Sequence, residues 1–364
     1  MRLRPFDDNC PFGERLCAVT ICPHKCVKGS WKFVLPSAVK TALELLKTEK
    51  LGLVNSVIIP VYKNADSLQE LLSDIDGIGS KLREPLEVVF VIDGSPDASY
   101  AILKHALPGR YQASQLICLS RNFGSFAAIR AGLARANGRY FAVMAADLQD
   151  PPETIIEFFN VLATEPVDIV VGARESRGDP GLSQVFSRAF WSVYRKFIIP
   201  DLPPGGVDIF GCNVMVRDAL CRLPEIGSSL IGLLFWIGFR RKSILYQRRP
   251  RPFGKSAWGF ARKLRYMLDS MYAFSDLPIS VLFCVGAFGI VISAIWGTIV
   301  FASWAFGSAD VPGYTSIVLL VIFFGGLNTL SMGILGAYLW RTFENTKGRP
   351  QSIVLTEERF GRSM

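Results

Sequence analysis

The sequence predicts an α/β domain with a doubly wound sheet, followed by two long apolar helices. Short β-branched runs alternate with helical stretches over residues 51–255, as in sheets that are covered by helices on both faces. Two runs without any charged residue, 279–306 and 314–340, follow further along the chain. Each run is long enough to cross a hydrocarbon core of ~30 Å as a helix.

The elements of the α/β part follow from hydrophobic periodicity. The first strand is predicted at 53–61, a buried run that contains Pro60 near its end. A helix is expected at 66–75, where apolar residues recur on one face, and another at 125–136. Further strands are predicted at 86–92, 116–119, 140–145 and 168–172.

Polar residues follow the carboxyl ends of four of these strands, namely Asp93, Arg121, Asp147 and Arg174. A single Asp-Gly-Ser sequence is as readily explained as a structural turn. Open α/β sheets, however, bind ligands just beyond the carboxyl ends of their strands. Four polar residues at that edge therefore predict one shared ligand cleft.

The densest group of oxygen ligands is the sequence ADLQDPP at 146–152. The carboxylates of Asp147 and Asp150 and the amide oxygen of Gln149 are hard ligands that suit Mg²⁺ or Mn²⁺. An alternative interpretation makes Asp150 the N-cap of a helix that begins with proline. The two interpretations are compatible, because Asp150 can cap the helix while Asp147 and Gln149 bind the ion.

Four motifs in this order resemble a known family: VIIPVYKN at 57–64, DGSPD at 93–97, SRNFG at 120–124 and ADLQDP at 146–151. The set is similar to family 2 glycosyltransferases of the Rossmann-like, doubly wound GT-A fold. It is most similar to the polyprenyl-phosphate branch, which comprises dolichol-phosphate mannose synthases and bactoprenol glucosyltransferases. The resemblance covers roughly residues 53–345 and includes the apolar helices. The chain departs from the family pattern at Ile92, Ala145 and Ala65.

This resemblance implies a membrane-bound, inverting transfer of a hexose from a nucleotide sugar to undecaprenyl or dolichyl phosphate. UDP-glucose is the favoured donor and GDP-mannose the next, and the expected cofactor is Mg²⁺ or Mn²⁺. Carried over by motif, the donor-binding residues are Pro60, Tyr62, Asp93, Arg251 and Lys255. The metal ligands are Asp147 and Gln149, and the catalytic residues are Asp147 and Asp150. The acceptor phosphate is bound by Arg174, Ser187 and Arg188.

The charges around the apolar runs predict their orientation. Lys and Arg are dense before residue 279 and after residue 340, whereas the loop 307–313 contains Asp310 and no basic residue. By the positive-inside rule, the catalytic domain and both termini are cytoplasmic, and the protein is integral to the cell inner membrane. The net charge of +9 suits contact with anionic lipid, and no nucleic-acid recognition motif accompanies it.

Two amphipathic segments, 182–199 and 260–274, carry basic residues beside an apolar stripe. They are interpreted as interfacial helices or as ordinary helices packed on the sheet, and the second lies in a juxtamembrane segment, 256–278. Glycines in the apolar runs permit close helix contact, including contact in a homo-oligomer. We interpret Asn328 as a structural hydrogen-bonding residue of these helices.

The remaining segments are an N-terminal extension at 1–50 and a basic cytoplasmic tail at 341–364. Four cysteines and His24 in the extension match no zinc pattern well, so a partly flexible extension is preferred to a metal knuckle. A processive polysaccharide synthase is disfavoured, because QRRP at 247–250 lacks the Gln-x-x-Arg-Trp motif. The alternative from another class is a non-catalytic membrane adaptor or lipid-carrier-binding protein with a degenerate transferase head.

Overall fold

The computed structural model describes residues 54–174, 195, 199–203, 206–225, 228–253, 260–306 and 314–361. The extension at 1–50 therefore lies outside the described residues, as does the segment 182–199 apart from Arg195 and Ile199. The expected site residues Ser187, Arg188 and Lys255 also lie outside them.

The described residues form one eight-stranded sheet with the order β7-β5-β6-β4-β1-β2-β3-β8. Its strands are β1 (Asn55–Val61), β2 (Leu86–Ile92), β3 (Ala113–Leu119), β4 (Tyr140–Val143), β5 (Ile169–Arg174), β6 (Val207–Asn213), β7 (Arg241–Tyr246) and β8 (Val354–Gly361). The five strands predicted from β-branched runs correspond to β1 to β5. The strands β6, β7 and β8 were not predicted.

The sheet is mixed, although its centre is parallel as the doubly wound prediction requires. Strand β1 pairs in parallel with β2 and β4, and β2 pairs in parallel with β3. Strand β6 runs antiparallel to both β4 and β5, and β8 runs antiparallel to β3. The α/β class is confirmed, with antiparallel strands added on both sides of the parallel centre.

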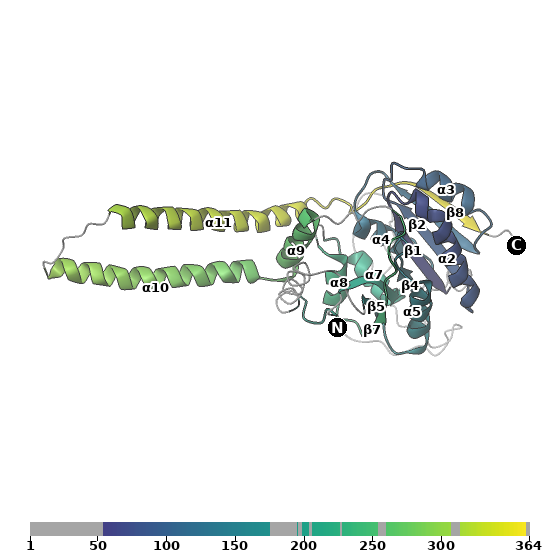
Figure 1. Cartoon of the computed structure of the whole chain (residues 1–364), viewed down its shortest axis with the longest axis horizontal. Helices are drawn as coiled ribbons and strands as arrows, with labels where there is room; N and C mark the ends of the chain where they lie inside the picture. Colours follow the sequence, from purple (N-terminus) through teal and green to yellow (C-terminus); the bar gives the residue numbers. More distant parts are fainter. Residues whose placement is uncertain are drawn as a thin grey trace, which may run out of the picture. The chain divides into compact units, whose positions relative to one another are not determined.

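Helices cover both faces of the sheet (Figure 1). Residues of α2 (Leu68–Lys81), α3 (Ser99–Ala106) and α5 (Pro152–Thr164) share one core cluster with the sheet. Residues of α4 (Ser125–Leu133), α7 (Val214–Arg222) and α8 (Leu230–Trp236) share the other. Successive residues of β1 alternate between the two clusters, because side chains on a strand point to opposite faces. The carboxyl ends of the parallel strands lie at one common edge.

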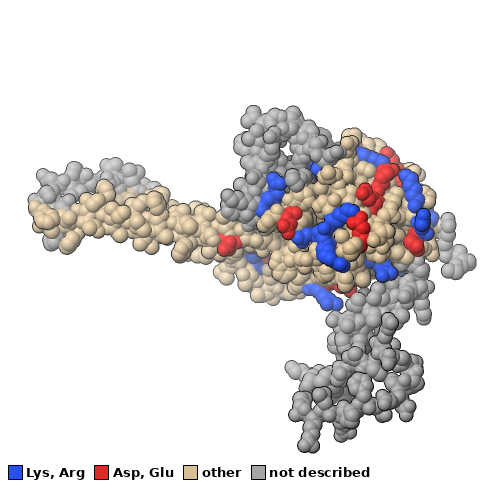
Figure 2. Space-filling model, turned by 90° about the horizontal axis from the view of Figure 1, so that it is seen from below, with Lys and Arg blue, Asp and Glu red and all other residues tan. Residues whose placement is uncertain are grey.

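Three helices follow the α/β part: α9 (Phe260–Phe274), α10 (Leu277–Ala305) and α11 (Tyr314–Thr346). Helices α10 and α11 lie side by side (Figure 1), and an added Cβ at Gly289 would lie 3.5 Å from the ring of Phe324. The face of the apolar helices that is visible in Figure 2 is almost free of charged side chains, in contrast to the α/β part. Among the described residues, one helical stretch, Leu277–Ile299, is by its length and composition long and apolar enough to cross a membrane. The predicted two-helix hairpin is therefore not confirmed as a membrane hairpin.

Helix α9 joins the apolar helices to the α/β part. Its residues Met271 and Phe274 pack against the core that contains α8, and its Ser270 is fully buried. The end of α11 is held to α9 by Arg341, whose Nη2 donates to the carboxylate of Asp269 at 2.5 Å. This side of α9 is therefore packed against protein, as the alternative interpretation of the segment expected.

Strand β8 returns the chain to the sheet after α11. The segment 341–364 was predicted to be a basic tail, whereas α11 continues to Thr346 and Val354–Gly361 pairs with β3. Two side chains of β8 form ion pairs with the α/β part: Glu357 accepts from Arg135 in the turn after α4 at 2.9 Å, and Glu358 accepts from Lys104 of α3 at 2.9 Å. The chain thus enters the apolar helices through α9 and returns from them to the edge of the sheet.

Candidate functional site

The turn at 147–150 follows β4 at the carboxyl edge of the sheet. Its residue Leu148 has a φ of 61°, a left-handed conformation that is uncommon for a residue other than glycine. The Leu148 side chain is only 2% exposed and belongs to the core cluster, which compensates for the backbone strain. The buried leucine therefore fixes the turn in which Asp147 and Gln149 lie on either side of it.

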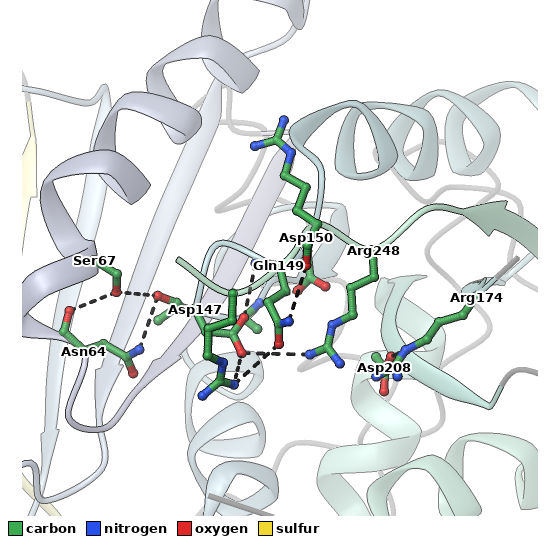
Figure 3. Close-up of polar contacts among 12 residues, drawn as sticks. Asn64, Ser67, Asp147, Gln149, Asp150, Arg174, Asp208 and Arg248 are labelled. Atoms are coloured by element: carbon green, nitrogen blue, oxygen red, sulfur yellow. Dashed lines mark hydrogen bonds and ion pairs between the residues drawn. The ribbon is translucent and has the colours of Figure 1, made fainter. Parts of the chain in front are cut away.

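Asp147 and Gln149 meet at the guanidinium of Arg251. Nη2 of Arg251 donates to Oδ2 of Asp147 and lies 3.5 Å from Oε1 of Gln149. Nη2 of Arg248 lies 3.9 Å from the same Asp147 oxygen (Figure 3). A carboxylate oxygen and an amide oxygen thus converge on one cationic group.

This arrangement fits the metal site that the sequence predicts. The two oxygens are hard ligands of the type that Mg²⁺ and Mn²⁺ prefer, and such ions complete their coordination with water and phosphate oxygens. In this structure, Arg251 provides the positive charge between them. Among the described residues, no group of three or more Asp, Glu, His or Cys side chains is arranged to hold a metal ion, so an ion here would depend on a bound substrate for further ligands.

Asp150 is the most buried carboxylate of the site, with 1% of the residue exposed. Its Oδ2 accepts a hydrogen bond from the backbone N–H of Ala145 at 2.9 Å, whereas its Oδ1 has no partner among the described residues. Burial raises the pKa of Asp150 to about 7; the Ala145 N–H and Arg248 oppose this shift, and Asp147 adds to it. A cation bound at Asp147 would favour the ionised carboxylate.

The alternative role of Asp150 as a helix N-cap is wrong. Helix α5 begins at Pro152, and Pro151 is its N-cap, without any side-chain cap hydrogen bond. Because the Asp150 carboxylate binds the N–H of Ala145 instead, it points back toward the end of β4 rather than toward α5. Oδ1 of Asp150 therefore lies inside the site without a partner in the part of the chain that the structure describes.

Arg174 ends β5 and forms an ion pair that the sequence did not predict. Its Nε donates to Oδ2 of Asp208 on β6 (Figure 3), and the hydroxyl of Tyr246 on β7 lies 3.5 Å from the same oxygen. Burial alone lowers the pKa of Arg174, but the Asp208 carboxylate outweighs this effect, so the net shift is upward. The guanidinium therefore stays charged.

Residues 247–251, here called the arginine strap, cross the turn at 147–150. The backbone N–H of Arg249 donates to the carbonyl oxygen of Gln149 at 2.9 Å, and Nε2 of Gln149 donates back to the carbonyl oxygen of Arg249 at 3.3 Å. The Arg249 guanidinium binds Asp74 of α2 at 3.1 Å and lies 3.6 Å from Glu153. The strap thus brings Arg248 and Arg251 to Asp147.

The other side of the site begins with the segment after β1. Tyr62 is 40% exposed there, while Pro60 is partly buried within the strand. Asn64 and Ser67 each donate to the carbonyl oxygen of Ala146, at 3.3 and 2.8 Å, which ties this segment to the turn that follows β4 (Figure 3). The aromatic ring of Tyr62 is thus held at the same sheet edge as Asp147.

Asp93 is placed differently from a residue that faces a ligand. It is 2% exposed, and its two carboxylate oxygens accept the backbone N–H groups of Phe123 and Gly124 at 2.7 and 2.8 Å. Burial raises its pKa, and these two N–H groups oppose the shift. Gly94 has a φ of 57°, and a Cβ there would collide with the backbone of Arg121. Asp93 therefore holds the loop 121–124 against the loop that follows β2.

The structure brings together five of the expected residues, namely Asp147, Gln149, Asp150, Arg174 and Arg251. Three residues that the sequence did not single out, Arg248, Asp208 and Tyr246, complete the same site. Arg248 was visible as one of several basic residues before the apolar runs, but nothing separated it from its neighbours. Asp208 and Tyr246 belong to strands that were not predicted, so the sequence could not predict that they lie at the edge of the site.

Comparison with known proteins identifies the family. The model of glycosyl transferase family 2 matches residues 56–222. An uncharacterized glycosyltransferase of Synechocystis is 32% identical over 300 residues, which cover 82% of this chain and 94% of that protein. A putative glycosyltransferase of Bacillus subtilis is 32% identical over 84% of this chain and 92% of that protein. The bactoprenol glucosyl transferase of Shigella phage SfV is 28% identical over 83% of this chain and 98% of that protein. The chain is a glycosyltransferase and belongs to family 2, with a GT-A-like α/β fold.

Proposed function

We propose that this chain transfers a hexose from a nucleotide sugar to polyprenyl phosphate with inversion of configuration. The observation that carries the proposal is the meeting of Asp147, Gln149 and Arg251 beside the buried Asp150. Relatives named bactoprenol glucosyl transferase support the acceptor, because bactoprenol is a polyprenol. Their name also supports glucose as the sugar, so UDP-glucose is the favoured donor and GDP-mannose the next.

The reaction is a single displacement. An oxygen of the acceptor phosphate attacks the anomeric carbon of the sugar while the bond from that carbon to the diphosphate breaks. The nucleotide diphosphate leaves with the electron pair. A phosphate monoester has a second pKa of about 6, so the acceptor is already a dianion for the most part at neutral pH. The site therefore needs no strong general base, and Asp150 acts beside the reacting carbon or as a further partner of the metal.

The donor side must neutralise the departing diphosphate. Asp147 and Gln149 would hold Mg²⁺ or Mn²⁺, and the bound ion would supply positive charge to the leaving group. Asp147 would then exchange its contact with Arg251 for one with the ion. The Arg251 guanidinium is thereby released to bind phosphate oxygens of the donor, a task to which its forked N–H groups are suited.

On the acceptor side of the site, Arg174 is proposed to bind the acceptor phosphate. Its partners Asp208 and Tyr246 lie close to Asp150: the Asp208 carboxylate raises the pKa of Asp150, and the Asp150 carboxylate raises the pKa of Tyr246. An acceptor phosphate bound by Arg174 would thus lie next to the carboxylate that is adjacent to the donor site. Ser187 and Arg188 are proposed to extend this phosphate site, and Lys255 to extend the donor site.

The apolar helices support a membrane location for this chemistry. We propose that α10 and α11 form a membrane hairpin, with the catalytic domain and both chain ends on the cytoplasmic side of the inner membrane. The uncharged runs 279–306 and 314–340 and the basic residues on their flanks support this topology. A polyprenyl phosphate is buried in lipid by its tail, so its head group meets the protein at the bilayer surface.

A donor screen tests the proposal. Purified protein in vesicles would be mixed with undecaprenyl phosphate and, in turn, UDP-glucose, GDP-mannose and other nucleotide sugars. We expect release of nucleotide diphosphate that requires Mg²⁺ or Mn²⁺ and the acceptor lipid. Absence of release with every donor would favour the alternative, a non-catalytic adaptor or lipid-carrier-binding protein. Ile92 and Ala145, which replace acidic residues of the family pattern, are the features that favour that alternative.

A further inference from the structure

Three neighbouring strands place Arg174, Asp208 and Tyr246 at one end of the sheet. Arg174 ends β5 and pairs in register with Tyr246, which ends the parallel strand β7. On the other side of β5, Gly172 pairs with Ile209 of β6, and the next residue, Ala173, pairs with Val207. Asp208 is therefore left without a partner residue on β5, at an irregularity in the pairing of the two strands. Bulges of this kind redirect a side chain and occur often beside active sites.

The local packing is built around this arrangement. A Cβ at position 172 would lie 2.7 Å from Cγ1 of Ile209 and 3.0 Å from Cε1 of Tyr246, so only glycine fits there without displacement. The missing side chain lets the Tyr246 ring approach the backbone of β5. Burial raises the pKa of Tyr246, and the carboxylates of Asp150 and Asp208 raise it further, so the phenol remains protonated and can donate to Asp208.

A second carboxylate lies near the Arg174–Asp208 pair, because the charge of Asp208 raises the pKa of Asp150. Asp150 is buried nearby and has one oxygen without a partner among the described residues, which makes it an attractive partner for a mobile guanidinium. The ion pair with Asp208 instead holds Arg174 by its Nε, while its terminal nitrogens carry the remaining N–H groups. The Arg174 and Asp208 side chains are 19% and 32% exposed, so the pair is partly shielded from water.

From this geometry we infer that Asp208, supported by the Tyr246 hydroxyl, is a positioning residue that orients Arg174 toward the acceptor phosphate and keeps it away from Asp150. This inference rests on the proposed function and adds to it a residue outside the recognised motifs. Asp208 does not touch the reacting atoms. It acts through Arg174, so its effect must appear in acceptor binding and must depend on the presence of the arginine side chain.

A double-mutant cycle in the full-length protein tests this dependence. Asp208→Asn should raise the KM for undecaprenyl phosphate by about tenfold and leave the donor KM nearly unchanged. In the background of Arg174→Ala, the same change should have no further effect on the acceptor KM. Asp208→Glu should restore most of the affinity, because it restores the charge. Tyr246→Phe, which removes only the hydroxyl, should raise the acceptor KM about twofold to threefold.

Asp201→Asn is the matched control, because Asp201 forms an exposed ion pair with Arg241 at 2.7 Å. It should change neither KM. Additive effects of Asp208→Asn and Arg174→Ala, or equal changes in the donor and acceptor KM, would overturn the inference. A fall in kcat with both KM values unchanged would assign Asp208 to the chemical step instead. If the wild-type protein itself releases no nucleotide diphosphate, the proposed function fails first, and this inference fails with it.

Discussion

Gln149 and Arg249 bind each other twice although they are 100 residues apart in the chain. One hydrogen bond runs from the Arg249 N–H to the Gln149 carbonyl, at 2.9 Å, and the other from Nε2 of Gln149 to the Arg249 carbonyl, at 3.3 Å. The turn that carries the proposed metal ligands and the strap that carries Arg248 and Arg251 are therefore one unit. A substitution in the strap is therefore expected to alter donor binding through these two hydrogen bonds.

The Arg249 side chain provides a test of that link. Arg249→Ala leaves both backbone contacts possible but removes the ion pair with Asp74, a partly exposed pair that contributes ~0.5–1 kcal/mol. We expect the donor KM to rise about threefold and the acceptor KM to stay constant. Arg110→Ala is the control, because Arg110 binds Asp76 of the same helix at 2.6 Å. Equal effects of the two substitutions would show that α2, and not the strap, is responsible.

Asp147 is expected to be indispensable for transfer. Asp147→Asn removes the charge that binds the cation and also the partner of Arg251. The rate of nucleotide diphosphate release should fall by about 100-fold or more, while the circular dichroism spectrum and the membrane fraction stay the same. Asp66→Asn changes an exposed aspartate on the segment after β1 and should leave the rate unchanged. Full activity of Asp147→Asn would remove the metal hypothesis.

Arg251 is expected to compete with the metal when no donor is bound. Its guanidinium contacts both oxygens that would bind the ion. Arg251→Ala should therefore tighten the binding of Mn²⁺ alone by about threefold to tenfold, measured by electron paramagnetic resonance, while turnover falls. The two readouts move in opposite directions, which a general loss of structure would not produce. Unchanged Mn²⁺ affinity would show that the ion does not bind where Arg251 lies.

The sequence was sufficient for the parts of the fold that depend on local patterns. The strands β1 and β2 are mostly apolar, β-branched runs, and the turn after β4 carries its carboxylates within a few residues. Strand β8 lacks such a signal. Its sequence VLTEERFG is short and has three adjacent charged residues, and its partner β3 lies more than two hundred residues earlier, so pairing depends on the path of the whole chain.

The candidate site shows the same division. Motif residues such as Asp147 and Gln149 were identified because their chemistry and spacing are visible in one turn. The role of Asp208 depends on an irregular step between β5 and β6, and the left-handed backbone of Leu148 depends on burial of its side chain. Neither feature is marked by a pattern of neighbouring residues in the sequence. Asp93 was assigned to the donor by motif, and that role stays a prediction; the contact of its carboxylate with the backbone of Phe123 and Gly124 has no local pattern either.

Strand β8 is expected to stabilise the catalytic domain. Removal of residues 354–364 would leave the edge of β3 unpaired and would break the contacts of Glu357 with Arg135 and of Glu358 with Lys104. The midpoint of thermal unfolding should fall, and limited proteolysis should cut the α/β part sooner. Glu358→Gln alone should have a much smaller effect, because exposed ion pairs contribute little. An unchanged midpoint after truncation would show that β8 is not needed for the fold.

Asp168 is expected to make stability depend on pH. It is 4% exposed and accepts hydrogen bonds from Arg240 and Asn213, which together lower its pKa despite the opposing effect of burial. The folded state thus binds the proton less readily than the unfolded state, whose aspartate pKa is about 3.9. The contribution is present above about pH 4 and is lost as the pH falls below that value.

Asp168→Asn tests this sign. The unfolding midpoint of the variant should lie below that of the wild type at about pH 7, and the gap should narrow as the pH is lowered to about 3. Arg240→Gln should weaken the same pH dependence, because the first cause of the lowered pKa is removed. If the difference in unfolding midpoint between variant and wild type stays constant over this pH range, Asp168 acts through packing at the start of β5 and not through its charge.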